Sequence, residues 1–261
     1  MTVRPAAVAG LFYPGDGKTL QQLVQRLLAD NPQPAPQAMP KALIVPHAGL
    51  VYSGPVAARA YNSLRPFAAD IRRVLLLGPS HRLAFRGIAM PAADSFASPL
   101  GRITLDTTAI KQLADQQLAG YLDQAHALEH SLEVQLPFLQ TLLPNARLLP
   151  LVVGDASWQQ VAAVLELFAD DPHTLIIISS DLSHYHAYDE AVAIDRATIQ
   201  SIEQRRPGLH GEQACGCRAL NGLLALAEQR GWQLQLVDYR NSGDTAGDHS
   251  RVVGYAAFIA A

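Results

Sequence analysis

The sequence predicts an α/β protein: a three-layer α/β/α sandwich around a mixed, mainly parallel sheet, formed as one domain over residues 1–261. Segments with helical apolar spacing alternate with short apolar runs that resemble buried strands, which is the pattern of parallel sheets covered on both faces. The hydrophobic content is 49%, and no polar low-complexity block divides the 261 residues. The last two strand candidates are joined without a helix, which makes the sheet mixed.

The N-terminal part begins with one predicted helix and a loop. Apolar residues recur at helical spacing over 20–28, and Asp16 precedes them in the position of an N-cap. Residues 31–39 hold three prolines in nine positions, which predicts a loop because proline stiffens turns and removes backbone donors. Too little chain precedes this loop to form a core, so we interpret it as a surface connection within one domain.

A βαβ unit is predicted next. The apolar run 42–45, a helix over 55–64 and the apolar run 74–77 follow one another, which places both strands in parallel. Residues 87–105 are rich in Pro, Ser and Ala and hold only short extended pieces. This composition favours loops that leave the sheet, or antiparallel edge strands, over a regular helical crossover.

The remaining chain alternates helices and strands. The strand candidates are short and largely apolar, as expected of strands buried between two helical layers. Helical spacing occurs over 107–119, 134–143, 161–168, 188–205 and 220–227, and strand candidates occur over 147–153, 175–179, 234–239 and 252–259.

Charge and composition exclude several classes of function. The formal net charge is -3 without a basic stripe, which argues against nucleic acid as a partner because phosphate binding needs clustered Lys and Arg. No run of about 18 apolar residues exists, and the first residues lack the pattern of a signal peptide. We therefore expect a cytoplasmic protein that has no membrane partner. In a reducing compartment, Cys215 and Cys217 are expected to be free thiols.

Three predicted strands are each followed within a few residues by a histidine. His47, His81 and His184 occupy these positions after the first, the second and the 175–179 strand. The carboxyl ends of parallel strands meet at the ligand-binding edge of an α/β sheet, where loops converge over a rigid floor. Imidazoles brought together there would form a transition-metal site. The alternative for each histidine alone is a solvated loop residue.

The segment around His184 is dense in polar groups and reads Ser-Ser-Asp-Leu-Ser-His-Tyr-His over residues 179–186. Asp181 suits orienting an imidazole or binding a substrate donor, and His184 or His186 suits metal binding or acid–base chemistry. A helix cap at Asp181 or Ser183 is the structural alternative. A Ser–His–Asp hydrolase is disfavoured because no Gly-x-Ser-x-Gly elbow occurs in the chain.

His126, Glu129 and His130 form the pattern His-x-x-Glu-His, which inverted zinc peptidases carry on one continuous helix. The residues just before the motif lack helical periodicity, and a proline follows it. We therefore favour a loop that leads into a helix starting near residue 131. His130 and Glu133 remain candidates to line a site.

Two further segments offer reactive or polar groups. Cys215 and Cys217 open a predicted helix that runs to Arg230, and a helix N-terminus stabilises a thiolate, which suits a nucleophile, a redox thiol or a soft metal ligand. A small buried residue at a helix start is the alternative. The acidic turn 241–248 includes Asp244, which either lines the site or lies in a solvated loop.

Six motifs occur in order along almost the whole chain. The motifs are P-H-A-G-L-V-Y-S-G (46–54), L-G-P-S-H (77–81), E-H-S-L-E-V-Q-L-P-F (129–138), S-S-D-L-S-H-Y (179–185), A-C-G (214–216) and N-S-G-D-T-A-G-D…S-R-V-V-G-Y-A (241–256). Together they closely resemble the Memo family, whose bacterial members are called AmmeMemoRadiSam system protein B. That family is similar in fold to class III extradiol dioxygenases of the LigB type, non-haem iron enzymes that open catechol rings.

The resemblance implies a metal pocket built from His47, His81 and Cys215 and completed by His184 and Asp181. It implies mononuclear Fe(II) with redox or oxygen-linked chemistry, and Zn(II) or Cu(I) are the other candidates. The dioxygenases hold iron with two histidines and a carboxylate, whereas Cys215 stands in the place of the carboxylate here. The resemblance therefore supports metal binding more strongly than it supports ring cleavage. The family name also implies AMMECR-type and radical-SAM partner proteins.

Two hypotheses for the function stay open. The first is a metalloprotein that acts on a small molecule, with His184 and Asp181 as its acid–base groups. The second is a non-catalytic binding module that holds a peptide or a modified side chain in the same pocket. The candidates to line the substrate pocket are Tyr52, His130, Glu133, His186 and Asp244.

Overall fold

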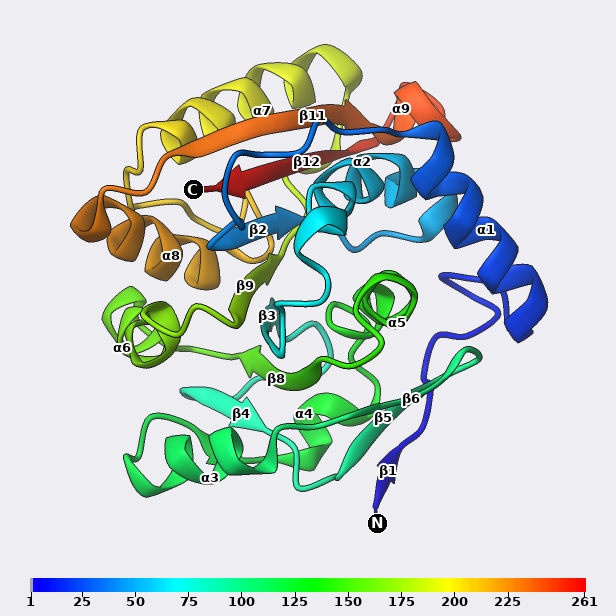
Figure 1. Ribbon diagram of the computed structural model, residues 1–261. Coiled ribbons are helices and arrows are strands. Elements are labelled where there is room, and N and C mark those ends of the chain that lie inside the picture. The colour runs from blue at the N-terminus through cyan, green and yellow to red at the C-terminus, as the bar shows by residue number, and fades with distance from the viewer. Residues whose placement is uncertain (1) are drawn as a thin grey trace.

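A nine-stranded mixed sheet forms the centre of the computed structural model, which describes residues 2–261 (Figure 1). Its strands run in the order β10-β12-β2-β9-β3-β8-β4-β7, and β11 pairs with β12 beside this path. Helices and strands interleave around the sheet, which confirms the predicted α/β architecture. The strands are β2 (Ala42–Val45), β3 (Arg73–Pro79), β4 (Ile88–Met90), β7 (Gly120–Tyr121), β8 (Arg147–Val153), β9 (Thr174–Ser179), β10 (His184–His186), β11 (Leu234–Asn241) and β12 (Val252–Ala260).

The four central strands, β2, β9, β3 and β8, are parallel and almost wholly buried. Val45 at the end of β2 lies opposite Ser179 at the end of β9, and Leu77 in β3 lies opposite Ile178. The loops that follow β2, β3 and β9 therefore leave the sheet at one edge. These are the three loops in which the sequence places strand-end histidines.

Most of the outer strands are antiparallel to their neighbours, whereas β7 at one end of the sheet pairs parallel with β4. Strand β12 pairs antiparallel with β2, β10 and β11, and β4 pairs antiparallel with β8. Strands β5 (Ser95–Ser98) and β6 (Gly101–Thr104) form a hairpin that joins β1 (Val3–Arg4) in a separate three-stranded sheet. The antiparallel strands expected within residues 87–105 are thus confirmed, although the hairpin lies outside the main sheet.

Helices cover both faces of the sheet (Figure 1). Helices α1, α2 and α5 pack together on one face, whereas α6, α7 and α8 cover the other. The Asp16 side chain accepts a hydrogen bond from the Thr19 amide over 2.8 Å, which confirms the predicted N-cap. The helices are α1 (Gly17–Asp30), α2 (Leu50–Asn62), α3 (Thr107–Asp115), α4 (Asp123–Ala127), α5 (Leu136–Leu142), α6 (Trp158–Ala169), α7 (Tyr188–Glu203), α8 (Cys217–Arg230) and α9 (Ser242–Thr245), with 3₁₀ turns at Arg65–Phe67 and Glu133–Gln135.

Some helix boundaries differ from the prediction. Helix α2 begins at Leu50 and contains Pro55, which removes only one hydrogen bond in its second turn. The helix expected over 107–119 ends at Asp115, and Gln117 beyond it has a left-handed backbone with a φ of 56°. Residues 123–127 form the short helix α4 where a loop was expected.

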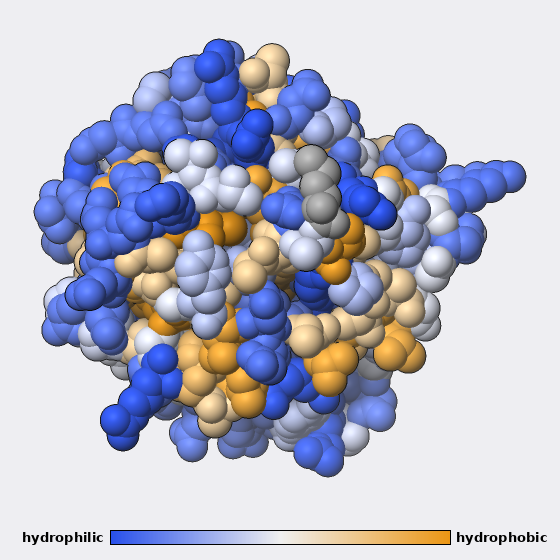
Figure 2. Space-filling view, turned by 90° about the horizontal axis from the view of Figure 1, so that it is seen from below, coloured by the Kyte–Doolittle hydropathy of each residue, from blue (hydrophilic) through white to orange (hydrophobic). Residues whose placement is uncertain are grey.

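One hydrophobic cluster extends from Val8 to Ala260 and includes the apolar side chains of all four central strands. Among the described residues, no helix combines the length and the apolar character that a membrane crossing requires. The face seen from below carries small hydrophobic patches separated by hydrophilic side chains (Figure 2).

Candidate metal centre

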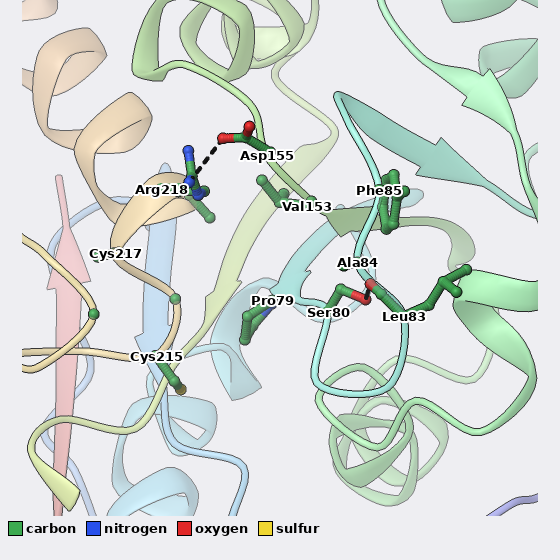
Figure 3. Close-up of a pocket in the computed structure, with 14 residues that line it drawn as sticks. Pro79, Ser80, Leu83, Ala84, Phe85, Val153, Asp155, Cys215, Cys217 and Arg218 are labelled. Carbon is green, nitrogen blue, oxygen red and sulfur yellow. Dashed lines mark hydrogen bonds and ion pairs between the residues drawn. The ribbon is translucent and has the colours of Figure 1, made fainter.

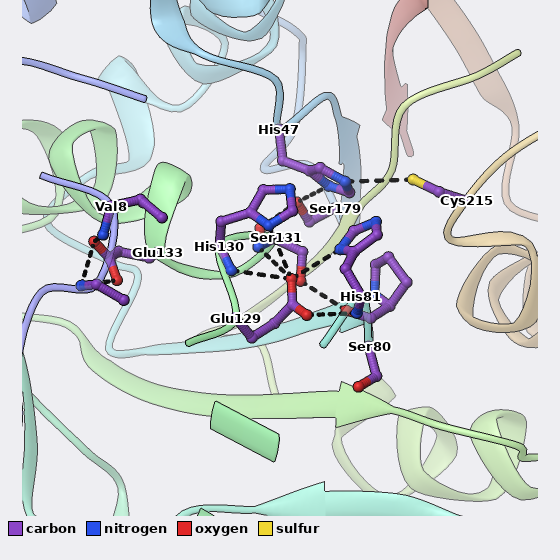
Figure 4. A network of polar contacts seen from close by, with 12 residues as sticks. Val8, His47, Ser80, His81, Glu129, His130, Ser131, Glu133, Ser179 and Cys215 are labelled. Carbon is purple, nitrogen blue, oxygen red and sulfur yellow. Dashed lines mark hydrogen bonds and ion pairs between the residues drawn. The ribbon is translucent and has the colours of Figure 1, made fainter. Parts of the chain in front are cut away.

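Three histidines converge at the carboxyl edge of the sheet (Figure 4). His47 follows β2, His81 follows β3, and His130 follows α4. Each has a ring nitrogen that lies within 4.8 Å of the corresponding nitrogens of the other two, and the three form a group that could hold a metal ion. The rings of His81 and His130 are stacked with centroids 4.5 Å apart, and His47 meets both edge-on.

Cys215 lies beside this cluster, two residues before α8 begins. Its Sγ is 3.3 Å from Nε2 of His47 and accepts a hydrogen bond from the Asp181 amide over 3.3 Å. Burial raises the pKa of the Cys215 thiol, and the negative charge of the Asp181 carboxylate raises it further. In this structure the neutral thiol therefore faces the His47 ring.

The tautomer of His47 is fixed by Ser179. The Ser179 hydroxyl donates its one hydrogen to the Ser131 carbonyl over 2.6 Å, because a carbonyl oxygen can only accept. Oγ of Ser179 therefore accepts from Nδ1–H of His47 over 3.0 Å and from the Gln135 amide over 2.8 Å. This leaves the His47 lone pair on Nε2, the nitrogen that faces Cys215. Burial holds the pKa of His47 well below its ordinary value.

The Glu129 carboxylate organises the other two histidines. It accepts hydrogen bonds from the backbone amides of His81, His130 and Ser131, and from Nδ1–H of His81 over 2.8 Å. Burial opposes ionisation, but the hydrogen bonds from His81 prevail and lower the pKa of Glu129 to about 2. An ionised carboxylate only accepts, so Nδ1 of His81 carries its hydrogen and Nε2 is left to bind a ligand.

His130 is held by packing as well as by its backbone. Its ring lies against Phe12 with centroids 4.6 Å apart. Its Nδ1 is buried without a hydrogen-bond partner and lies 3.4 Å from Oε1 of Glu129. Burial lowers the pKa of His130 to about 4, and His81 contributes to this shift to a smaller extent. The ring is therefore neutral near pH 7, as metal binding requires.

A cavity of about 760 Å³ opens above the three histidines. Tyr52, His184 and His186, which are site candidates from the sequence, line it together with Asp181. Oδ1 of Asp181 accepts a hydrogen bond from the backbone amide of His47 over 2.7 Å, so this buried carboxylate also fixes the first histidine loop. Burial raises the pKa of Asp181.

Cys215 also lines a second, smaller cavity of about 350 Å³ (Figure 3). Leu83 and Phe85 line this cavity, and Arg218 pairs there with Asp155 over 2.8 Å. Cys217 lines this second cavity and not the one above the histidines.

Two predicted site residues lie elsewhere. Glu133 is fully buried and binds Arg4, the Tyr13 hydroxyl and the amide of Val8, so it faces the N-terminal segment (Figure 4). Asp244 lies within α9, where it accepts hydrogen bonds from the backbone amide of the N-cap residue Asn241 over 2.8 Å and from the Tyr188 hydroxyl over 2.7 Å. Neither lines the cavity above the histidines. Local sequence could not show that both carboxylates are used by structural partners.

The His-x-x-Glu-His motif is divided by the fold. Helix α4 ends at Ala127, so His126 and His130 do not share one continuous helix. Nε2 of His126 hydrogen bonds to the Ala89 carbonyl over 3.1 Å, whereas His130 joins His47 and His81. The arrangement that a zinc peptidase needs is therefore absent from this motif.

Several residues at the site carry no sequence signal of their own. Phe12, Ser179 and Gln135 support the histidines, and Arg82 lines the cavity. Ser179 and Gln135 lie within motifs that the sequence singles out, but nothing in those motifs shows that the two side chains hold His47. Arg82 directly follows the 77–81 motif, and Phe12 lies near the N-terminus.

The fold and the site together define an α/β protein with a histidine cluster, flanked by a cysteine, at the carboxyl edge of a mixed sheet. A family model described as Memo-like protein matches residues 4–259. The chain is 34% identical over 271 residues to a MEMO1 family protein of Aquifex aeolicus, with 99% of each chain covered. It is 35% identical over 284 residues to a MEMO1 family protein of Ignicoccus hospitalis, with 98% of each covered.

The chain therefore belongs to the Memo-like family, as its six motifs predict. Among solved structures, an uncharacterized protein of Escherichia coli K12 aligns with 83% of this chain and 99% of its own length, with a TM-score of 0.49 and 14% identity.

Proposed function

We propose that this protein binds one Fe(II) ion in the histidine cluster and uses it for redox or oxygen-linked chemistry on a small molecule. His47 and His81 are two of the proposed ligands, because both the sequence and the histidine cluster place them at the site. Cys215 and His130 are the candidates for the remaining donors. The observation that carries the proposal is the convergence of the three histidines, with Cys215 beside His47, beneath a cavity large enough for a substrate.

The donor set fits a transition metal. A metal bound to a histidine nitrogen and a thiolate at the usual bond lengths places these two atoms about 3.4–3.6 Å apart. The 3.3 Å between Nε2 of His47 and Sγ of Cys215 is close to this separation. Imidazole and thiolate donors suit Fe(II), Zn(II) and Cu(I). The resemblance to the extradiol dioxygenases favours Fe(II) among them.

The supporting hydrogen bonds also fit this role. Metal-binding histidines usually donate their second ring N–H to a carboxylate, a carbonyl or another oxygen. His47 donates to Ser179 and His81 donates to Glu129, so both present Nε2 in the unprotonated form. The buried Nδ1 of His130, which has no hydrogen-bond partner, is a further donor that a bound ion would satisfy.

Asp181 and His184 are proposed as the acid–base pair. Both line the cavity, and the raised pKa of buried Asp181 suits a group that must take up or release a proton. When bound, Fe(II) supplies a redox centre. The two side chains would hold or move a proton on the substrate beside it.

Anaerobic Fe(II) titration of the metal-free protein, with Co(II) as a spectroscopic substitute, tests the proposal. We expect one ion per chain, lost in His47→Ala and in His81→Ala. Comparing Cys215→Ser with His130→Ala identifies the remaining ligands, because only a bound thiolate gives a sulfur-to-cobalt charge-transfer band. His126→Ala is the matched control, since this buried histidine lies outside the cluster. Absence of stoichiometric metal in the unmodified protein would contradict the proposal.

A non-catalytic binding module is the second candidate, and the mouth of the cavity favours it. Leu11, Tyr52 and Tyr185 line the cavity and are 80%, 37% and 64% exposed. Exposed large apolar side chains around a concave site are typical of binding surfaces. This candidate requires a peptide or a modified side chain to bind with an affinity that survives chelation. It would be abandoned if every ligand needed the metal and was chemically altered. Association with AMMECR-type and radical-SAM proteins stays a prediction.

A further inference from the structure

Tyr185 has an unusual backbone at the mouth of the cavity. Its φ is 64°, in the left-handed region that glycine adopts readily and a bulky aromatic residue rarely adopts. It is the middle residue of β10, where His184 pairs with Val253 and His186 pairs with Val252. Two adjacent residues of β12 thus face three residues of β10, and Tyr185 is the extra residue of a β-bulge.

The bulge changes which side chains reach the cavity. In a regular strand successive side chains point to opposite faces, so Tyr185 would point away from His184 and His186. Here all three line the same cavity. A bulge next to a site commonly redirects a side chain in this way, and strain of this kind concentrates at functional sites.

The Tyr185 ring is held in place and remains available. The guanidinium carbon of Arg251 lies over the ring, 5.1 Å from its centroid, and the His184 ring meets it at 5.8 Å and 66°. The residue is nevertheless 64% exposed. Arg251 thus backs one face of the ring. The cavity also contains aromatic residues Phe12 and Tyr52.

We propose that Tyr185 is a ligand-binding residue that stacks against a planar ring of the molecule bound in this cavity. The inference rests on the proposed function only in that it concerns the same cavity, and it needs no metal. Ring pairs prefer stacked or edge-to-face contacts, which a saturated ring of equal size cannot reproduce. The ligand class that this residue selects is therefore a planar, unsaturated ring.

The first test measures backbone strain. Tyr185→Gly and Tyr185→Ala both remove the ring, but only glycine adopts a φ of 64° without cost. We expect the glycine variant to melt about 2–4 °C above the alanine variant, the reverse of the order found in ordinary strand positions. Equal melting temperatures, or a more stable alanine variant, would show an unstrained backbone and remove strain as an argument for the proposal.

The second test measures the affinity of the cavity for planar and saturated rings. It uses metal-free protein in the presence of a chelator, so that a negative result cannot be caused by an absent metal site. Benzoate and cyclohexanecarboxylate share a carboxylate, which Arg82 in the cavity can bind, and differ in the planarity of the ring. We expect tighter binding of benzoate by calorimetry, and about a tenfold loss in Tyr185→Ala and Tyr185→Gly. Tyr185→Phe keeps the ring and should keep the affinity.

Two results would overturn ring recognition by Tyr185. One is equal affinity of the unmodified protein for the two acids, including no measurable binding of either. The other is an unchanged affinity for benzoate in both the glycine and the alanine variants.

Discussion

The carboxylate of Glu129 binds His81 at two points, accepting from its backbone amide over 2.5 Å and from its Nδ1–H over 2.8 Å. The same carboxylate accepts from the backbone amide of His130. One buried side chain thus sets the position of two of the three clustered histidines. It also joins the loop after β3 to the segment after α4.

Replacing Glu129 with glutamine should weaken metal binding by about 10- to 100-fold, which is the usual cost of losing a hydrogen-bonding partner of a metal ligand. The amide presents N–H groups where the carboxylate accepts, so at least one of its hydrogen bonds is lost. Competition against a chromophoric chelator measures the affinity. Glu190→Gln is the control, because Glu190 lies 3.2 Å from His186 in an exposed pair outside the cluster. Equal affinities in the two variants would contradict the role of Glu129.

Replacing Arg4 with methionine should destabilise the protein by about 3–5 kcal/mol, because it leaves the Glu133 carboxylate buried without its cation. Arg4 and Glu133 are 6% and 0% exposed. Arg4 also donates to the carbonyls of His126 and Glu129. Denaturant unfolding measures the change. Lys111→Met, which breaks an exposed pair with Asp115, should cost less than about 0.5 kcal/mol.

His126 should make stability depend on pH in the acidic range. Burial lowers the pKa of His126 from 6.5 to about 4. The unfolded chain then binds the proton more readily, so the stabilisation is complete above pH 6.5 and is lost as the pH falls toward 4. The loss is about 3 kcal/mol over this range. His126→Gln, which keeps a donor for the Ala89 carbonyl, should flatten the profile of unfolding free energy against pH by that amount.

Gly254 should tolerate no side chain. A Cβ built there would lie 2.0 Å from Oδ2 of Asp195, a buried carboxylate that accepts from the Ser183 amide and the Tyr239 hydroxyl. Gly254→Ala should therefore destabilise the protein by about 1–3 kcal/mol. Gly120→Ala is the matched control, since no atom lies within 4 Å of its added Cβ. Thermal unfolding of the two variants makes the comparison, and equal losses would contradict the steric argument.

Most of the fold could be predicted because its signals are local. The strands 42–45 and 147–153 match the structure at both ends, since each is an apolar run bounded by polar or turn residues. The cap at Asp16 follows from the same kind of pattern. Helix ends were less predictable, as at Asp115 and Leu50, because packing and loop geometry decide where a periodic segment stops.

The candidate site could be predicted in part. His47 and His81 follow parallel strands, and the topology alone brings their loops to one edge. His130 was predicted only as a residue that lines the site. Its place beside His47 and His81 could not be predicted, since it depends on Glu129 binding the loop after β3 and on Phe12 packing against the His130 ring. Cys215 lies next to His47, although whether it binds the metal stays a prediction.

The sequence by itself determined the α/β class, the family, and the edge of the sheet at which the histidines gather. These follow from apolar periodicity, motif order and the direction of parallel strands. Only the tertiary structure decided which polar groups reach the cavity. Glu133 and Asp244 are taken up by distant partners, whereas His130 and Tyr185 are turned toward the site. The physical reason is that buried polar groups must be satisfied, and their partners come from segments far apart in the chain.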